Sequence, residues 1–188
     1  MIHSTAVVFA GGKSSRMGQD KALLPFANYP TLSEYQYHKL STLFTHVYLS
    51  SKEDKFNFKV PIVKDLYTQS SPLVGIVSVF ETLDVDEVFI LSVDTPFVTQ
   101  EIIEKLFSYP KNYDAIIAKS SKGVQPLCGI YRRTLLAQAK AHLTQDNHRL
   151  NHLLKVSHTK FIDFKDEKAF INVNTPQEYE EALRIESK

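Results

Sequence analysis

A loop rich in glycine, hydroxyl groups and cations begins at Ala10, directly after an apolar run. Gly11 and Gly12 lack a Cβ, so they can adopt positive φ and let backbone N–H groups lie close to a phosphate. Arg16 can make forked contacts to phosphate oxygens, and Lys21 can act as a point charge. The loop therefore predicts a binding site for a triphosphate. It lacks the G-x-x-x-x-G-K-[ST] and G-x-G-x-x-G spacings, and the alternative is a surface loop with incidental charges.

Two aspartates each follow an apolar run. Asp94 follows residues 88–93, and Asp65 follows residues 60–64. In open α/β sheets ligands bind outside the carboxyl ends of the strands, and Mg²⁺ typically takes one or two protein carboxylates together with water and phosphate oxygens. We predict that Asp94 binds Mg²⁺ and that Asp65 contacts the nucleotide. The alternative is that each aspartate only caps the following turn, and this alternative has more weight for Asp65 than for Asp94.

The elements that must position these residues alternate between strand and helix. The predicted strands are residues 6–10, 46–50, 60–63, 88–93, 114–118, 129–132 and 160–164, with a short one at 170–173. The predicted helices are residues 31–44, 73–83, 99–108, 134–143, 147–155 and 176–185. Thr99 is the predicted cap of one helix, and Thr175 with Glu178 is the predicted capping box of the last. The alternation predicts one Rossmann-like α/β domain over residues 1–188, a three-layer sandwich with a mostly parallel sheet.

Composition excludes several classes of protein. With 188 residues and 43% hydrophobic content, the chain can build one sizeable core. Its 22 Lys and Arg balance 21 Asp and Glu, so no overall positive field exists to bind nucleic acid or an anionic membrane. No apolar stretch nears the roughly 20 residues that span a bilayer. The single cysteine, Cys128, excludes an internal disulfide, and with no basic leader in the sequence we expect a cytoplasmic protein.

Six sequence blocks together resemble one enzyme family. The blocks are residues 10–13, 16–18, 20–21, 71–75, 94–96 and 170–176. In this order they are similar to the molybdenum cofactor guanylyltransferases. The opening block alone is shared by many nucleotidyltransferases, whereas the Asn-Val-Asn-Thr-Pro ending at residues 172–176 narrows the resemblance. The resemblance, taken over all six blocks, covers essentially the whole chain.

The resemblance implies a nucleotide-diphospho-sugar transferase fold, transfer of GMP from GTP to the phosphate of Mo-molybdopterin, and Mg²⁺ as cofactor. It also makes molybdenum cofactor biosynthesis proteins or a molybdoenzyme chaperone candidate partners. The catalytic residues that it implies are Arg16, Lys21 and Asp94, with Asp94 also on Mg²⁺. The implied nucleotide-binding residues are Ala10, Gly11, Gly12, Lys21, Ser50, Asp65 and Asp94, and the implied pterin-side residues are Asn172 and Asn174.

Three positions depart from the family pattern. Ser50 stands in place of an asparagine, Val93 in place of a cysteine, and Gln125-Pro126 in place of a histidine-proline pair. Ser50 matters most, because a serine offers one hydroxyl where an amide offers both a donor and an acceptor to a base. The base preference therefore stays open.

Two other functions remain as alternatives. The first is a cytidylyltransferase of the same pterin or a sugar-phosphate nucleotidyltransferase, since the loop and Asp94 would serve any nucleoside triphosphate. The second is a nonenzymatic protein that binds nucleotide or cofactor and delivers it, against which the presence of Lys21 and Asp94 argues. Arg149, with Arg132 and Arg133, could contact the pterin phosphate, although a solvated helix face is the simpler interpretation.

Overall fold

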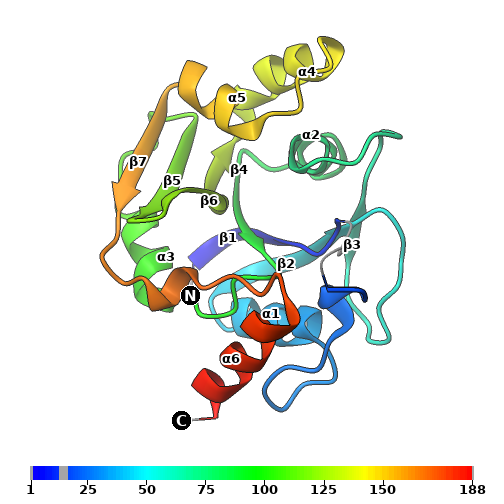
Figure 1. The fold of residues 1–188 in the computed structure, drawn as a ribbon. Coiled ribbons are helices and arrows are strands. Elements are labelled where there is room, and N and C mark those ends of the chain that lie inside the picture. Colours follow the sequence, from blue (N-terminus) through cyan, green and yellow to red (C-terminus); the bar gives the residue numbers. More distant parts are fainter. Residues whose placement is uncertain (1, 13–16, 188) are drawn as a thin grey trace.

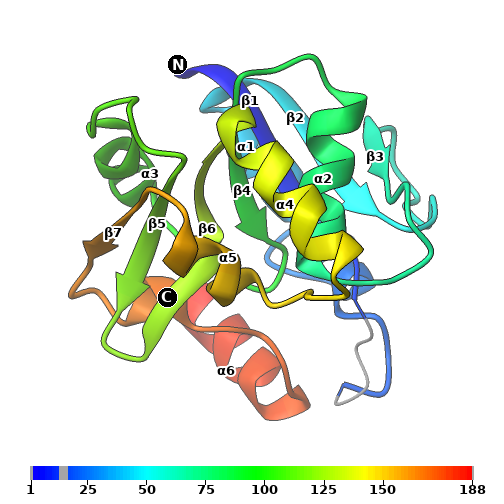
Figure 2. The ribbon, with the colours of Figure 1, turned by 90° about the horizontal axis from the view of Figure 1, so that it is seen from above.

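Apolar side chains alternate between the two faces of the central strands, and both faces are therefore covered. In the computed structural model, which describes residues 2–12 and 17–187, Ala6 and Val8 of β1 belong to one buried cluster. Val7 and Phe9 belong to the other. Successive side chains of a strand point to opposite faces, so each strand of this kind supplies two separate cores. The α/β sandwich thus has a helical layer on each side of one sheet (Figures 1 and 2).

The sheet has seven strands in the order β3-β2-β1-β4-β6-β5-β7. β6 is antiparallel to both of its neighbours, whereas every other pair is parallel, which confirms the mostly parallel sheet. The strands are β1 (Ile2–Phe9), β2 (Phe44–Ser51), β3 (Ile62–Lys64), β4 (Glu87–Ser92), β5 (Ala115–Ser120), β6 (Gly123–Arg132) and β7 (Thr159–Asp163).

Two groups of helices cover the sheet. The first group packs on the face that bears Ala6 and consists of α1 (Leu32–Ser41), α3 (Gln100–Phe107) and α6 (Pro176–Glu186). The second packs on the opposite face and consists of α2 (Pro72–Thr82), α4 (Leu136–Thr144) and α5 (Leu150–Val156). Three short 3-10 helices complete the described chain: η1 (Lys21–Leu23), η2 (Arg133–Leu135) and η3 (Lys168–Phe170). Among the described residues, no helix has the length and apolar character to cross a membrane.

Several predicted boundaries differ from the structure, and the starts of β2 and β6 show why. The helix predicted to extend to Phe44 ends at Ser41, and Phe44 begins β2, where its ring stacks on Phe89 with centroids 5.4 Å apart. β6 begins at Gly123, six residues before the predicted start at residue 129. The sequence did not predict this part of β6 as a strand because it contains Pro126, and a proline cannot donate a ladder hydrogen bond. The pairing of β5 with β6 is irregular there, with a register shift between Ile117 and Lys119.

The short strand predicted at residues 170–173 was wrong. Residues up to Phe170 form η3, and the chain then continues without strand pairing. The backbone N–H of Val173 donates to the carbonyl of Asp94 at 2.9 Å. The apolar pattern at 170–173 therefore reflects packing of this segment against the turn after β4, since Phe170 and Val173 are both buried.

One of the two predicted caps is correct and the other is not. Thr175 accepts a hydrogen bond from the backbone N–H of Glu178 at 3.3 Å, as predicted for the start of α6. The Glu178 carboxylate then accepts from the backbone N–H of Asn174 at 3.0 Å. Thr99 has the extended backbone of an N-cap but makes no side-chain cap hydrogen bond. The nearby Thr99 hydroxyl instead lowers the pKa of the Glu101 carboxyl.

Candidate active site

The candidate site residues lie where four neighbouring strands end at the same edge of the sheet. Phe9, at the end of β1, pairs with Ser50 of β2 on one side and with Ser92 of β4 on the other. Ser51 pairs with Lys64, after which Asp65 leaves β3. The carboxyl ends of the parallel strands therefore bring the glycine-rich loop, Asp65 and the turn that carries Asp94 to one edge, as the sequence predicted.

The glycine-rich loop begins beside the end of β2. Ala10 donates its backbone N–H to the carbonyl of Ser50 at 3.0 Å. Gly12 has φ +121°, and among the described residues other than its chain neighbours no atom lies within 4 Å of the position that a Cβ would occupy there. This backbone conformation favours glycine, and both Gly11 and Gly12 line a cavity. Arg16 lies outside the described residues.

Lys21, Asp94 and Asn174 meet at one point, although they come from η1, the turn after β4 and the segment before α6. The Lys21 Nζ forms an ion pair with the Asp94 carboxylate and donates to Asn174 Oδ1 at 2.9 Å. The side chains of Lys21 and Asp94 are 17% and 15% exposed, so the pair is partly screened from water. η1 is fixed by Asp20, whose carboxylate accepts from the backbone N–H of Ala22 at 3.0 Å.

A cavity of about 480 Å³, here called the glycine cavity, lies between the glycine-rich loop and the start of α2. Its described lining includes Phe9, Gly11, Gly12, Ser50, Asp65 and Gly75. Desolvation raises the pKa of the Asp65 carboxyl, and the nearby charge of Lys52 opposes that shift. Ser50 is buried, and a Cβ on Gly75 would lie 2.7 Å from Phe9 Cε2. The close packing of Phe9 on α2 therefore requires glycine at position 75.

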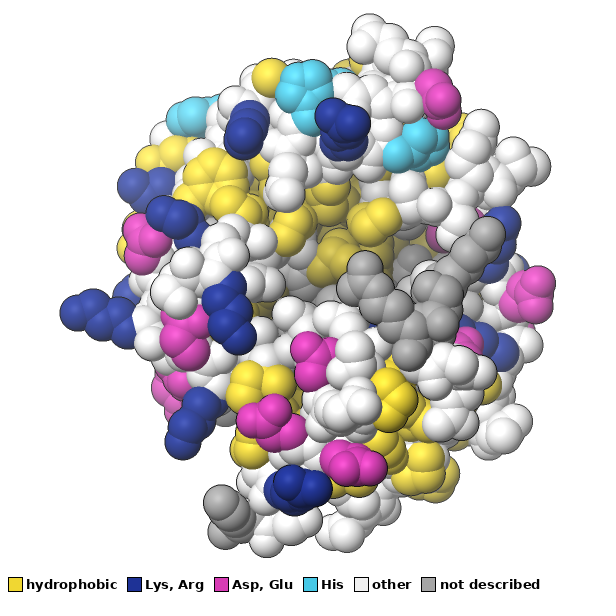
Figure 3. Space-filling view, in the orientation of Figure 1, with side chains coloured by type: hydrophobic (Ala, Val, Ile, Leu, Met, Phe, Trp, Pro, Cys, Tyr) yellow, Lys and Arg dark blue, Asp and Glu magenta, His cyan; other side chains and the backbone are white. Residues whose placement is uncertain are grey.

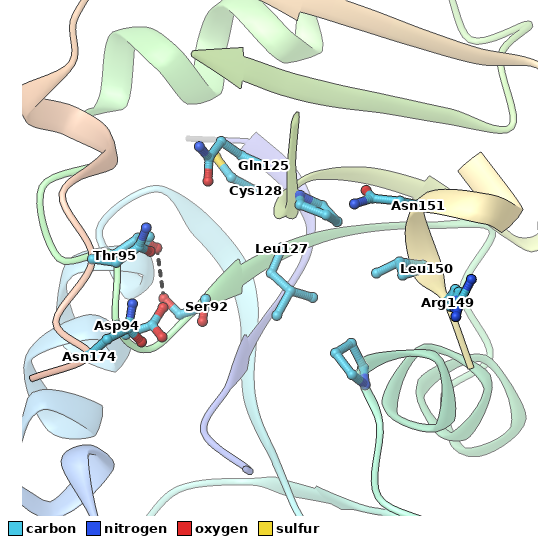
Figure 4. Close-up of a pocket in the computed structure, with 13 residues that line it drawn as sticks. Ser92, Asp94, Thr95, Gln125, Leu127, Cys128, Arg149, Leu150, Asn151 and Asn174 are labelled. Carbon is cyan, nitrogen blue, oxygen red and sulfur yellow. Dashed lines mark hydrogen bonds between the residues drawn. The ribbon is translucent and has the colours of Figure 1, made fainter. Parts of the chain in front are cut away.

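A second cavity of about 500 Å³, here called the asparagine cavity, adjoins the first. Asp94 and Asn174 line one side of it, and Arg149 to Asn151 line the opposite side (Figure 4). Asn172 also belongs to its lining. The two cavities share Pro72, Ser92 and Leu127 in their linings, so they form a continuous hollow. Figure 3 shows this face of the molecule hollowed, with hydrophobic side chains inside and Lys, Arg and His side chains along the rim near α4 and α5.

The shared boundary separates the predicted residues into two sets. Gly11, Gly12, Ser50 and Asp65 line the glycine cavity, whereas Asn172 and Asn174 line the asparagine cavity. Asp94 also lines the asparagine cavity and lies two residues after the shared Ser92. The geometry thus offers room for two ligands, with the Lys21–Asp94 pair near the place where they would meet.

Comparison with known proteins identifies the family. A family model described as the MobA-like NTP transferase domain matches residues 6–161. The chain belongs to this family. A molybdenum cofactor guanylyltransferase of Campylobacter jejuni is 40% identical over 177 residues, which cover 93% of this chain and 92% of that protein. One from Helicobacter pylori is 35% identical and covers 95% of this chain and 88% of its own length. The MobA-like chain is therefore a nucleotidyltransferase.

Solved structures agree on the fold. Molybdopterin-guanine dinucleotide biosynthesis protein A of Archaeoglobus fulgidus superposes with a TM-score of 0.85 at 21% identity, covering 98% of this chain and 99% of that one. A 2-C-methyl-D-erythritol 4-phosphate cytidylyltransferase of Thermus thermophilus gives 0.73 at 13% identity and covers 100% of both chains. At these identities the likeness establishes the nucleotide-diphospho-sugar transferase fold that the sequence implied.

The donor groups of this MobA-like chain fit a hard divalent cation that is shared with a polyphosphate. Asp94 is the only acidic residue in the described lining of the asparagine cavity, and Asn172 and Asn174 belong to the same lining. Within residues 2–12 and 17–187, no group of three or more His, Cys, Asp and Glu side chains could hold a metal ion. A single carboxylate suits Mg²⁺, which keeps several waters and takes phosphate oxygens as its other ligands.

Sequence reasoning missed Lys55, which lies in the loop between β2 and β3. Its Nζ donates to the carbonyl of Ala10 at 2.9 Å and forms an ion pair with the Asp20 carboxylate. Lys55 thus joins the two ends of the glycine-rich loop. No spacing in the sequence could have indicated this, because Lys55 is 45 and 35 residues away from its two partners.

The start of α2 is linked to the turn before α5 by a chain of hydrogen bonds that the sequence did not indicate. Ser71 Oγ lies 2.8 Å from His148 Nδ1, and His148 Nε2 lies 3.1 Å from Asp146 Oδ1. Ser71 also caps α2 by accepting from the N–H of Val74 at 3.2 Å. The linked turn leads directly into Arg149, which is how Arg149 comes to line the asparagine cavity.

The other two arginines considered with Arg149 have structural partners instead. Arg132 is buried, pairs with Glu87 at 2.9 Å and donates to the carbonyl of Tyr113 at 2.6 Å. Arg133 donates to three backbone carbonyls at the end of α2 and in the segment after it, those of Phe80, Leu83 and Val85. Neither lines the two cavities, so the pterin-phosphate contact considered for them is not supported.

Proposed function

We propose that this MobA-like nucleotidyltransferase transfers GMP from GTP to the phosphate of Mo-molybdopterin, with residues 1–188 acting as one domain. The observation that carries the proposal is the pair of adjoining cavities with Lys21 and Asp94 near their boundary. A nucleotide fits the glycine cavity, where the loop backbone and the half-buried carboxyl of Asp65 are available. An acceptor fits the asparagine cavity, whose lining combines apolar side chains with amides and Arg149. The names of the relatives support guanine and molybdopterin as the two substrates.

In the proposed reaction, an oxygen of the acceptor phosphate attacks the α-phosphorus of GTP. One P–O bond forms, the bond between the α-phosphorus and the bridging oxygen breaks, and pyrophosphate leaves with the electron pair. No protein nucleophile is needed. Cys128 lines the asparagine cavity, but its thiol is buried and burial raises its pKa to about 12, so it is inert at neutral pH.

The chain's own residues would act by position and charge. We assign Ala10, Gly11 and Gly12 to the nucleotide phosphates together with Arg16, and Lys21 to the charge that builds on the leaving pyrophosphate. Asp94 would hold Mg²⁺, which when bound neutralises phosphate oxygens and orients the triphosphate. The contact of Lys21 with Asp94 supports a role for both at the same phosphates.

The remaining assignments concern recognition of the two ligands. Asp65 and Ser50 lie in the glycine cavity, where a carboxylate can accept hydrogen bonds from the N–H groups of guanine. Asn172 and Asn174 are assigned to the pterin side, which their place in the asparagine cavity supports. A cytidylyltransferase would use the same loop and Asp94, so base preference separates the two functions.

We further propose that the reaction takes place in the cytoplasm and that the product passes to a molybdenum cofactor biosynthesis protein or a molybdoenzyme chaperone. The single buried thiol, Cys128, supports a reducing compartment, since secreted proteins of this size commonly carry disulfides. The chemistry supports the handover, because a dinucleotide cofactor acts only after it is bound by the enzyme that uses it.

Calorimetric titration with GTP and with CTP, each in the presence of Mg²⁺, tests the proposed base preference. We expect GTP to bind more tightly than CTP. Ser50→Asn is the matched variant, because it restores an amide at this buried position and should strengthen GTP binding without altering the rest of the glycine cavity. Tighter binding of CTP by the wild-type protein would favour the cytidylyltransferase alternative.

A further inference from the structure

The turn that carries Asp94 rests on side chains of α1, which lies on the face of the sheet opposite α2. Gln36 of α1 is fully buried. Its Nε2 lies 3.3 Å from the carbonyl oxygen of Ser92 and 3.1 Å from that of Thr95, with the carbonyl of Val93 at 3.4 Å. One side-chain amide therefore contacts the backbone on both sides of Asp94.

Lys39 extends this contact by one residue of the turn. It follows Gln36 by three positions, so the two side chains lie on the same side of α1. The Lys39 Nζ donates to the carbonyl of Pro96 at 2.6 Å. α1 thus supplies hydrogen-bond donors to the turn at its start, at its middle and at its end.

The backbone carbonyl of Asp94 has a different partner. It accepts from the N–H of Val173 at 2.9 Å, while the hydroxyl of Thr95 donates back to Ser92 at 2.9 Å. Every carbonyl from residue 92 to residue 96 consequently has a donor. A turn whose carbonyls are all bonded has little freedom to rotate its peptide planes, and the direction of the Asp94 side chain is fixed with them.

The amide of Gln36 would be a poor choice for core packing alone. Its Oε1 is buried and has no hydrogen-bond partner among the described residues, and burying an unpaired acceptor is unfavourable. An apolar side chain of similar volume would avoid that cost. The stabilising contacts of Gln36 are therefore those of its donor end, which all go to the turn around Asp94.

We propose that Gln36, assisted by Lys39, is a positioning residue that holds the Asp94 carboxylate in the orientation required to bind Mg²⁺ with the nucleotide. The inference rests on the proposed role of Asp94. It predicts that loss of the Gln36 donor weakens Mg²⁺-dependent steps and spares those that need no metal.

The test compares GTP binding in EDTA with GTP binding in Mg²⁺ by calorimetry, together with the rate of pyrophosphate release. Gln36→Met removes the two N–H donors of the Gln36 amide and keeps the side-chain volume nearly constant. We expect GTP affinity in EDTA to stay within about twofold of wild type. The gain in affinity on adding Mg²⁺ should fall about tenfold, and kcat should fall by at least as much, because misplacing a group by 1 Å can cost about 100-fold.

Two further variants keep the test decisive. Lys39→Met removes the donor to Pro96 and should reduce the Mg²⁺-dependent gain in the same direction, so it carries the test if Gln36→Met does not fold. Leu40→Ala is the matched control: Leu40 is also fully buried on α1 but donates nothing to the turn. It should lower stability and leave the Mg²⁺-dependent gain unchanged.

The outcomes separate this inference from the proposed function. A full Mg²⁺-dependent gain in both Gln36→Met and Lys39→Met would overturn the positioning role, and so would an equal loss in Leu40→Ala. If the wild-type protein binds GTP but its affinity does not depend on Mg²⁺, that result contradicts the metal role proposed for Asp94, on which the positioning role of Gln36 rests. Reduced Mg²⁺ dependence confined to the two donor variants supports the inference.

Discussion

Lys21 donates a hydrogen bond from Nζ to Oδ1 of Asn174 at 2.9 Å, across a sequence separation of 153 residues. The same ammonium group pairs with Asp94. Asn174 is oriented in turn by its backbone N–H, which donates to Glu178 in the capping box of α6. The start of the last helix therefore contributes to the geometry of the site, where one lysine joins Asp94 to Asn174.

Loss of the Lys21 charge should impair turnover far more than stability. Lys21→Met leaves Asp94 without this cation and removes a donor from the phosphates, so we expect kcat/KM to fall by about 100-fold or more. Pyrophosphate release measures the effect, and thermal unfolding reports the fold. Lys140→Met is the matched control, since Lys140 also pairs with a carboxylate, that of Glu81, but lies on the exposed surface. Equal kcat/KM values in Lys21→Met and wild type would remove Lys21 from the mechanism.

A methyl group at position 75 should weaken nucleotide binding without unfolding the protein. The new Cβ would lie 2.7 Å and 3.0 Å from two atoms of the Phe9 ring, which lines the glycine cavity and must shift. Alanine is favoured over glycine in a helix by about 1 kcal/mol, which offsets part of the crowding. We expect Gly75→Ala to raise the Kd for GTP several-fold while the free energy of unfolding changes by less than about 1 kcal/mol.

Gly129→Ala provides the contrast to that variant. A Cβ at Gly129 of β6 would lie 2.6 Å from the carbonyl oxygen of Ile116 and 2.6 Å from Ile117 Cδ1. The backbone of β5 cannot give way as a ring can, so we expect a loss of about 1–3 kcal/mol in the free energy of unfolding. GTP affinity of the folded fraction should be unchanged. The same pattern of effects in both variants would contradict the role given to Phe9.

The ionisation of Asp65 should make GTP binding depend on pH. Desolvation raises the pKa of this carboxyl, so it gains a proton at a pH where an ordinary aspartate, with a pKa of about 3.9, is still charged. Once protonated, Asp65 loses acceptor capacity toward the base, and GTP affinity should fall as the pH is lowered through the raised pKa. Asp65→Asn should lack this component.

Titration calorimetry from pH 8 down to about pH 4.5 measures that dependence. Protonation of the triphosphate itself affects the wild-type protein and Asp65→Asn alike. The difference between the two pH profiles therefore isolates Asp65. Parallel profiles would mean that its carboxylate does not contact the nucleotide.

Lys39 should give the protein a stability that rises with pH in the alkaline range. Burial lowers the pKa of Lys39 to about 8, whereas the unfolded chain has the ordinary value of about 10.4. Between these values the unfolded state binds more protons, so the contribution of Lys39 to the free energy of unfolding increases with pH. Urea denaturation of wild type and Lys39→Met at pH 7.5 and pH 10 measures it. An unchanged difference between the two proteins would show that the lysine is not desolvated.

The sequence was a good guide to the sheet edge because hydrophobic alternation and strand ends are local signals. Asp65 and Asp94 each follow an apolar run, and parallel strands bring such positions together. The strand prediction at residues 170–173 was wrong because it also used a local signal alone. Local hydrophobicity does not distinguish a paired strand from a segment packed on a turn.

The contacts that hold the site together could not be predicted, because they depend on which side chains meet in three dimensions. Gln36 lies in a helix that the sequence predicted, but only the fold places its amide under the turn of Asp94. Lys55 gives no signal in a loop of mixed polarity. Arg149 belonged to a set of three arginines, and the structure separates it from the two that bond elsewhere.

The most direct test of the proposed function is turnover by the purified protein with GTP, Mg²⁺ and Mo-molybdopterin, with pyrophosphate and dinucleotide product measured together. We expect one pyrophosphate for each molybdopterin guanine dinucleotide formed, a lower rate with CTP, and no product from Asp94→Asn that is folded as judged by thermal unfolding. Binding of GTP without pyrophosphate release by the wild-type protein would contradict the proposal and favour a nonenzymatic delivery protein.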